Sequence, residues 1–309
     1  MSLESGNGAT LSASIGAASG PAGGLPPLKR ARSAYTAMAA TATAFCAVLF
    51  LLPVAITVAT SFHPSTGMGL VGDAWTSDNY ANLFRDDYFM RVLSTTVLLG
   101  LITATIATTL AYPLAYFIVR SPSRFVKYVL ALVVAPMFIS SVVRALGWVL
   151  VLGEFGPLNV VFVWLGILSA PIKLTYNFAG VVIGVVHWVY PFVVLILVAS
   201  IYTVNPDLEA VARDLGASWR KTFLRVTLPL TLSGVVSAFL LALSATVSGY
   251  TTMVLLGGGR VKVASMLIAD YFRGILNYPA GAAVSMILLL TTLVLAGAGT
   301  AVFNRGIRG

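Results

Sequence analysis

The polar chemistry of this sequence is concentrated in one short stretch, LEAVARDLGASWRKTFLRVTLPL, which covers residues 208 to 230. Its six charged side chains lie within seventeen residues and can form ion pairs along a helix surface. The sequence contains no catalytic set of paired carboxylates, clustered histidines or serine with histidine, and no GxxxxGKS/T phosphate loop. We therefore expect no enzyme activity, no catalytic residue, no metal site and no ATP hydrolysis by this chain alone.

The first half of the stretch has the pattern of a short, capped helix. Asn205 can cap a helix whose first position is Pro206, where the missing N–H costs nothing. Asp207 and Glu209 fall in the first turn, where the helix dipole favours negative charge. One apolar stripe follows helical spacing: Leu208, Val211, Ala212 and Leu215. Gly216 then suits the left-handed residue that ends a helix.

The second half is consistent with another short helix. Ser218 can cap it, and Trp219, Phe223 and Val226 would share one face. Pro229 is expected to end this helix before the next apolar run. Two interpretations are open. The stretch could be an amphipathic loop resting on lipid headgroups, which basic residues favour, or a helix–turn–helix presenting a fixed surface to a cytosolic partner.

The elements on both sides of the stretch are long and apolar. The chain has 309 residues, of which 58% are hydrophobic and 9% charged, whereas soluble domains carry about 25% charged residues. Six stretches are long enough to cross about 30 Å of hydrocarbon as helices, and none alternates as a membrane strand does. They cover residues 35–61, 92–119, 128–152, 176–203, 228–256 and 275–303. We predict an all-α membrane protein with six transmembrane helices.

The positive charge indicates the topology of these spans. With six spans both termini share a side, and twelve of the nineteen Lys and Arg residues fall on that side, six on the other, with Arg144 inside a span. The positive-inside rule then places both termini in the cytoplasm. The net charge of +9 is therefore explained by topology, and we expect no nucleic-acid partner.

Outside the spans, the chain is predicted to have a tail and several short helices. Residues 1–34, rich in Ala, Ser, Gly and Pro, are expected to form a disordered cytoplasmic tail before a transmembrane domain over 35–309. A short helix is expected after Ser77 or Asp78, and another within 156–168 at the outer face. The connection 257–274 also shows helical spacing, at Val263, Met266, Leu267 and Tyr271.

The charged stretch resembles the signature loop of bacterial binding-protein-dependent ABC importer permeases. That family's pattern is Glu-Ala-Ala, three residues, Gly, nine residues, then Ile-x-Leu-Pro. Here Glu209-Ala210-Val211 precedes Gly216, and Val226-Thr227-Leu228-Pro229 follows at the same spacings, with two conservative changes to Val. Five further segments resemble the spermidine/putrescine permease branch: DNYANLF (78–84), YPLAYFIVR (112–120), the segment 136–144, YPFVVL (190–195) and NYPAGAA (277–283).

The resemblance implies the type I ABC importer (MetI-like) permease fold in a bacterial inner membrane, with the core region at about 91–303 and a coupling loop at 205–229. It implies four kinds of partner: a cytosolic ABC ATPase dimer that binds ATP and Mg, a second permease subunit, a periplasmic solute-binding protein and membrane lipid. It also implies that no cofactor belongs to this chain. The residues implied to contact the ATPase are Glu209, Ala210, Arg213, Asp214, Gly216, Ala217, Trp219, Phe223 and Pro229. Glu209, Arg213 and Asp214 would form a polar rim around the apolar stripe.

Polar residues inside the spans are candidates for a substrate path. They are Arg144, His187, Tyr190, Ser244, Ser248, Tyr250 and Thr251. A structural role competes with each of them, since Ser and Thr often bond between helices and a mid-span histidine is commonly satisfied in the core. Arg144 is expected to anchor itself by snorkelling or by bonding carbonyls of 153–175, and a substrate-facing role is the alternative.

The sequence is compatible with more than one class of transported solute. The branch resemblance implies a polyamine, and because no Asp or Glu lies within a span, aromatic faces and hydroxyls would have to hold it. Arg144 makes an anionic or zwitterionic solute, such as an amino acid or phosphonate, an alternative. An ion-coupled secondary transporter is an alternative of another class, but it would normally show intramembrane acidic residues or paired broken helices.

Overall fold

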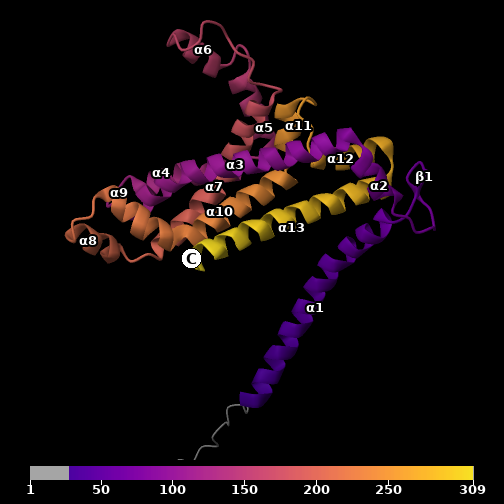
Figure 1. Ribbon diagram of the computed structural model, residues 1–309, viewed down its shortest axis with the longest axis horizontal. Helices are drawn as coiled ribbons and strands as arrows, with labels where there is room; N and C mark the ends of the chain where they lie inside the picture. Colours follow the sequence, from indigo (N-terminus) through magenta and orange to yellow (C-terminus); the bar gives the residue numbers. More distant parts are fainter. Residues whose placement is uncertain (1–27, 309) are drawn as a thin grey trace, which may run out of the picture. The chain divides into compact units, whose positions relative to one another are not determined.

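A computed structural model describes residues 28 to 308, which are mostly helical (Figure 1). The chain divides into two units, one up to Val54 and one from Ala55, and each is described by itself. The first unit contains most of α1 (Leu28–Ser61). This helix begins inside the segment 1–34 for which we predicted disorder. The rest of that segment, residues 1–27, lies outside the described residues.

The second unit contains the remaining elements. Its first half has the hairpin β1 (Ser65–Gly67) and β2 (Leu70–Val71), α2 (Asp78–Arg85), α3 (Asp87–Arg120), α4 (Val126–Val134), the 3-10 helix η1 (Ala135–Phe138), α5 (Ser141–Leu152), α6 (Pro157–Trp164) and α7 (Phe178–Tyr202). Its second half has α8 (Pro206–Asp214), α9 (Trp219–Thr222), the π-helix η2 (Phe223–Thr227), α10 (Leu228–Ser248), α11 (Thr251–Gly257), α12 (Ala264–Ala269), the π-helix η3 (Asp270–Ile275) and α13 (Tyr278–Arg308).

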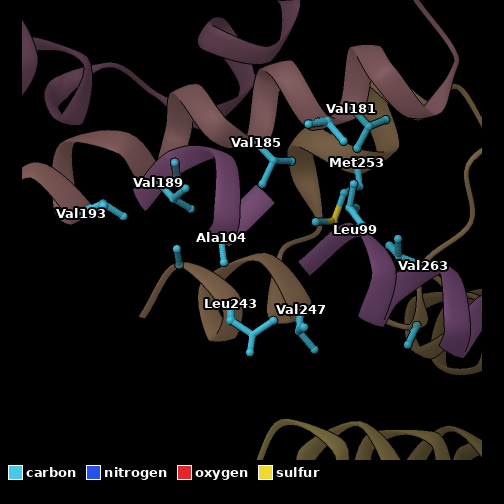
Figure 2. Close-up of a cluster of buried hydrophobic side chains, with 14 of the residues drawn as sticks. Leu99, Ala104, Val181, Val185, Val189, Val193, Leu243, Val247, Met253 and Val263 are labelled. Atoms are coloured by element: carbon cyan, nitrogen blue, oxygen red, sulfur yellow. The ribbon is translucent and has the colours of Figure 1, made fainter. Parts of the chain in front are cut away.

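The core of the second unit forms where α3, α7 and α10 pack against one another. Figure 2 shows one face of α7, where fully buried valines recur every fourth residue at Val181, Val185, Val189 and Val193. They lie beside buried residues of the two other helices, Leu99 and Ala104 on α3 and Leu243 and Val247 on α10. The three helices therefore form one rigid seam.

Gly100, a residue without a side chain, allows α3 to pack closely against α10. A Cβ at Gly100 would lie 2.9 Å from Leu243 Cδ1 and 2.9 Å from Val247 Cγ2, which is closer than packed atoms tolerate. Small residues allow membrane helices to pack closely in this way. Two ends of the unit follow from the packing: α8 and α9 lie at one end, and α2 and α12 at the opposite end (Figure 1). We call them the α8 end and the α2 end.

The number of predicted spans is confirmed. Six segments of the described chain are long and apolar enough to cross a membrane, namely Met38–Ser61, Asp87–Arg120, Ser141–Trp164, Phe178–Tyr202, Trp219–Ser248 and Tyr278–Ala301. The predicted short helices are also present, as α2, α6 and α12, and Val263, Met266 and Leu267 are buried as their spacing indicates.

Two predicted spans have the wrong boundaries. The apolar run 128–152 is broken between η1 and α5, where Ile139 and Ser140 leave the helical conformation. The run 228–256 is broken at Gly249, where α10 ends before α11 begins. Apolar composition does not report such breaks, since the residues on both sides remain hydrophobic.

Candidate functional site

The predicted helix–turn–helix forms at the α8 end. The Asn205 side chain accepts a hydrogen bond from Asp207 N at 2.9 Å, so Asn205 caps α8 with Pro206 in the first position. Gly216 has φ of +85°, the left-handed conformation predicted for the residue that ends this helix. Ala217 N donates to Ala212 O at 3.0 Å and closes the turn. The local chemistry of the stretch therefore holds α8 in a fixed shape.

Glu209 is the buried centre of this site. The residue is 3% exposed, and its Oε1 lies 3.0 Å from Arg120 Nη2 and 3.1 Å from Arg120 Nε. Tyr116 donates its hydroxyl to Glu209 Oε2 at 2.8 Å, and Thr227 donates to Oε1 at 3.1 Å. The prediction that Glu209 belongs to a polar rim is therefore wrong: its carboxylate points into the protein and fixes α8 to α3 and η2.

Arg120 contacts both the end of α7 and the start of α8. Its Nη2 also donates to Val204 O at 2.9 Å, so it holds the end of α7 and the start of α8 together. The guanidinium and carboxylate side chains are 16% and 4% exposed, so the pair lies largely out of water. Removing one partner of a buried ion pair costs about 3–5 kcal/mol, because the other charge remains uncompensated. We call Arg120, Glu209, Tyr116 and Thr227 the α8 clamp.

The opposite face of α8 is open. The apolar side chains predicted to form a stripe are exposed, at 48% for Leu208, 54% for Val211 and 84% for Leu215. Ala210, Arg213 and Asp214 are exposed beside them, and Arg213 Nε donates to the Glu209 carbonyl at 3.1 Å. Nothing else in the described part of the chain covers this stripe, so α8 has one face fixed to the bundle and one apolar face free.

The second short helix differs from the prediction. Ser218 stands at the N-cap of α9, but its side chain makes no capping hydrogen bond. Pro229 does not end the helix, because α9, η2 and α10 follow one another without a break. The π-helix η2 ends at Thr227, and Pro229 stands in the first turn of α10, where a missing N–H is tolerated. The three elements therefore form one continuous helical segment.

The two aromatic residues of this half pack toward α3. Trp219 and Phe223 stack with ring centroids 5.8 Å apart, and Phe223 meets Tyr112 edge-on at 5.4 Å. Together with Tyr116 they line an apolar cavity of about 410 Å³ between α3 and α10. The structure thus places Trp219 and Phe223 against this chain's own helices, although Trp219 stays largely exposed.

Sequence reasoning missed most of the α8 clamp. Arg120 and Tyr116 belong to the segment YPLAYFIVR, whose only predicted significance was its resemblance to the permease branch. A signal was available, because both residues lie one turn apart at the end of an apolar span, where an arginine needs a partner. Only the fold shows that this partner is Glu209.

Three of the predicted path residues meet in one cavity. Ser248, Tyr250 and Thr251 line a cavity of about 210 Å³ at the break between α10 and α11. Trp188 of α7 and Ser141 of α5 complete its polar and aromatic wall. The described residues that line this cavity include neither a cation nor a carboxylate. We call it the Tyr250 cavity.

The other path candidates lie outside this cavity and have partners within the chain. Tyr190 donates to Leu110 O at 3.2 Å, and His187 Nδ1 accepts from Trp148 Nε1 at 3.1 Å. The backbone carbonyl of Ser244 accepts the hydroxyl of Ser248 at 2.8 Å, a bond that does not involve the Ser244 side chain. Arg144 Nη1 donates to Pro136 O at 2.8 Å. The carbonyl that Arg144 binds thus belongs to η1 and not to the segment 153–175. This hydrogen bond links α5 to η1 within the chain, which agrees with the predicted anchoring role.

The Arg144 contact leads to a prediction. A lysine can still reach a carbonyl at the same depth, whereas a methionine cannot donate. We expect Arg144→Lys to keep near-normal uptake per assembled complex and Arg144→Met to lower the yield of assembled protein. Uptake normalised to detergent-stable complex measures this. A lysine variant with full abundance and little uptake would instead indicate that the guanidinium grips a carboxylate or phosphonate in the path.

The structure combines six segments long enough to span a membrane with a helix pair fixed at one end, which defines a multi-pass membrane protein. The chain belongs to the family of binding-protein-dependent transport system inner membrane components, which matches residues 97–308. It is a multi-pass inner membrane protein and the permease subunit of an ABC importer, a class in which a partner subunit hydrolyses ATP. This family membership excludes the alternative of an ion-coupled secondary transporter.

Among its relatives are permeases named for polyamine transport. The chain is 33% identical over 244 residues to the spermidine/putrescine transport system permease protein PotB of Salmonella typhimurium, covering 79% of this chain and 85% of the relative. It is 32% identical to PotB of Escherichia coli, covering 79% and 88%. It is also 31% identical to the molybdenum transport system permease protein ModB of Mycobacterium bovis, covering 66% and 78%.

Solved structures confirm the fold class. A bacterial ABC transporter that imports the acidic polysaccharide alginate matches with a TM-score of 0.73 and 21% identity, over 90% of this chain and 97% of that chain. A methionine ABC transporter, MetNI, in an inward-facing conformation matches with a TM-score of 0.53 and 16% identity, over 71% and 94%. The predicted MetI-like permease fold is therefore correct.

Proposed function

We propose that this permease carries a polyamine such as spermidine or putrescine from a periplasmic binding protein into the cytoplasm. The observation that carries the proposal is the 32–34% identity to spermidine/putrescine permeases over 76–79% of the chain. The Tyr250 cavity supports it. Its wall offers hydroxyl groups and the faces of Tyr250 and Trp188, which attract an ammonium group, and it contains no cation that would repel one.

The proposed assembly has two permeases and two ATPase subunits, with a second permease of a different sequence and an ATPase dimer that supplies ATP and Mg. In it, α8 is the coupling helix. Its open apolar stripe would lie in a groove of the ATPase, and its clamped face would pass the movement of the ATPase to α3. The exposed stripe of Leu208, Val211 and Leu215 supports this role, since an apolar face of this kind requires a partner.

An oxyanion is the second candidate cargo. The relative named for molybdenum transport supports it, because that permease is 31% identical over 211 residues. The two candidates differ in charge, so stimulation of the assembled ATPase by its binding protein separates them. We expect stimulation when the binding protein is loaded with spermidine or putrescine and none with molybdate. The opposite pattern would replace the polyamine with an oxyanion.

Both termini and the α8 end are proposed to face the cytoplasm, as the excess of Lys and Arg on that side indicates. The prediction uses a chain in which Cys46 is replaced by serine. A cysteine at Ser218, exposed at the α8 end, should be shielded from an impermeant thiol reagent added outside intact cells. A cysteine at Gly274, where a side chain has open space, should be labelled. Labelling at 218 alone would reverse the topology and remove the coupling role.

A further inference from the structure

The α2 end contains a second cavity, of about 540 Å³, whose lining includes three cationic side chains. Its walls come from three elements: Tyr88, Arg91 and Thr95 of α3, Phe178 of α7, and Arg260 and Lys262 of the connection between α11 and α12. Val92 and Val261 form its apolar lining and belong to the buried core. The cavity therefore lies over the end of the packed bundle and shares no lining residue with the Tyr250 cavity.

The charge of this cavity is not balanced. Lys262 Nζ is paired with Asp270 Oδ2 at 3.0 Å. Among the described residues, no carboxylate lies within 4.0 Å of the guanidinium groups of Arg91 and Arg260, and neither group donates a hydrogen bond. Asp87 lies one helical turn before Arg91 on α3 but makes no ion pair with it, and Asp86 accepts a hydrogen bond from Tyr88 N at 2.8 Å as the cap of α3. Two uncompensated cations thus line one hollow, which attracts an anionic group.

The cargo does not fit this hollow. A polyamine carries several positive charges, and the arginines that line the hollow would repel them. The anion must therefore come from something other than the proposed cargo. In the topology proposed above, the α2 end faces the periplasm, the side from which the proposed binding protein would reach the permease.

We propose that Arg91 and Arg260 form the docking socket for an acidic side chain of the periplasmic binding protein. Charges at the rim of an interface chiefly steer encounter and orient the partner, and their effect falls with added salt. The socket would hold the binding protein over the α3–α7 seam, so that released cargo meets the Tyr250 cavity and not the basic hollow. This inference rests on the proposed function and extends it to the site where the partner docks.

The test uses the assembled permease–ATPase complex in phosphatidylcholine nanodiscs, titrated with its cognate, cargo-loaded binding protein. For the double variant Arg91→Glu with Arg260→Glu, we expect the concentration for half-maximal ATPase stimulation to rise about tenfold or more at low salt. The maximal rate should be retained at saturating binding protein. The difference should shrink as salt approaches about 0.5 M, where the Debye length is only a few ångströms. The variant with Gln at both positions should shift the titration less.

The matched control is the double variant Lys173→Glu with Arg273→Glu. These two exposed cations change the net charge equally, but they do not line the hollow. We expect their half-maximal concentration to stay within about twofold of the wild type. An equal shift in the control, or a lower maximal rate with an unchanged half-maximal concentration, overturns the proposal. A shift that appears only in nanodiscs with phosphatidylglycerol assigns the hollow to a lipid headgroup. A wild-type complex that no binding protein stimulates contradicts the proposed function itself.

Discussion

Replacing Arg120 with leucine is expected to destabilise the protein by about 3–5 kcal/mol and to uncouple ATP hydrolysis from transport. The variant leaves the Glu209 carboxylate buried at 3% exposure without its cation. Tyr116 and Thr227 still donate hydroxyl groups, but neutral donors do not compensate a full charge in this setting. The measurements are the thermal midpoint of the purified complex and the number of cargo molecules moved per ATP hydrolysed.

Two further variants separate stability from coupling. Replacing both Arg120 and Glu209 with leucine removes the buried charges together, which is often neutral for stability. We expect this double variant to regain much of the thermal midpoint but to transport less per ATP, because α8 is no longer fixed to α3. Arg124→Leu is the matched control, since it removes one exposed cation from the same end of the bundle and should change little. Normal transport per ATP in the double variant would mean that the clamp is only structural.

Placing a charge on the open face of α8 should have the second large effect. In the proposed coupling, Leu215, now 84% exposed, becomes buried in a groove of the ATPase. Burial of a leucine contributes about 1.5–3 kcal/mol, and an aspartate there would also have to lose its hydration. We expect Leu215→Asp to weaken ATPase binding at least about 100-fold, which corresponds to about 2.7 kcal/mol. Copurification and a binding titration with the isolated ATPase measure the change.

The control for this experiment lies at the opposite end of the unit. Leu70 of β2 is 65% exposed, so an aspartate can replace it without burying a charge. Its strand pairs with β1, which lies at the end of the unit opposite α8 (Figure 1). Leu70→Asp should leave ATPase binding unchanged, while Leu215→Ala should weaken it by less than the aspartate does. If the aspartate at 215 copurified with the ATPase as well as the wild type does, the open stripe would not be the contact surface.

The local structure of α8 could be predicted because its signals are short-range. Asn205, Pro206 and Gly216 each act on their own backbone within a few residues, and each has the predicted conformation. The spans were predictable for a similar reason, since their lengths follow from apolar composition alone. Nearly every residue of α7 is apolar, so the sequence predicts that this helix spans the membrane but does not show which of its faces is buried.

The direction of Glu209 could not be predicted from the same pattern. The helix dipole favours a glutamate in the first turn whichever way its side chain points. The partner that sets its direction, Arg120, is eighty-nine residues away in the chain. The break before α5 and the π-turn before Pro229 were missed for a related reason. A proline is compatible with a helix start as well as with a helix end, and both Pro136 and Pro229 stand at the start of a helical element. The Tyr250 cavity likewise depends on α5 and α7 meeting the break between α10 and α11.

Uptake by the fully reconstituted importer tests the central claim most directly. This permease, its second permease and the ATPase would be placed in liposomes, with labelled spermidine and the binding protein on the side of the α2 end and ATP on the side of the α8 end. The account predicts accumulation of spermidine that requires ATP, the binding protein and an intact α8 clamp. Accumulation that proceeds without ATP, or a complex that ignores spermidine and putrescine while accumulating an oxyanion, would contradict it.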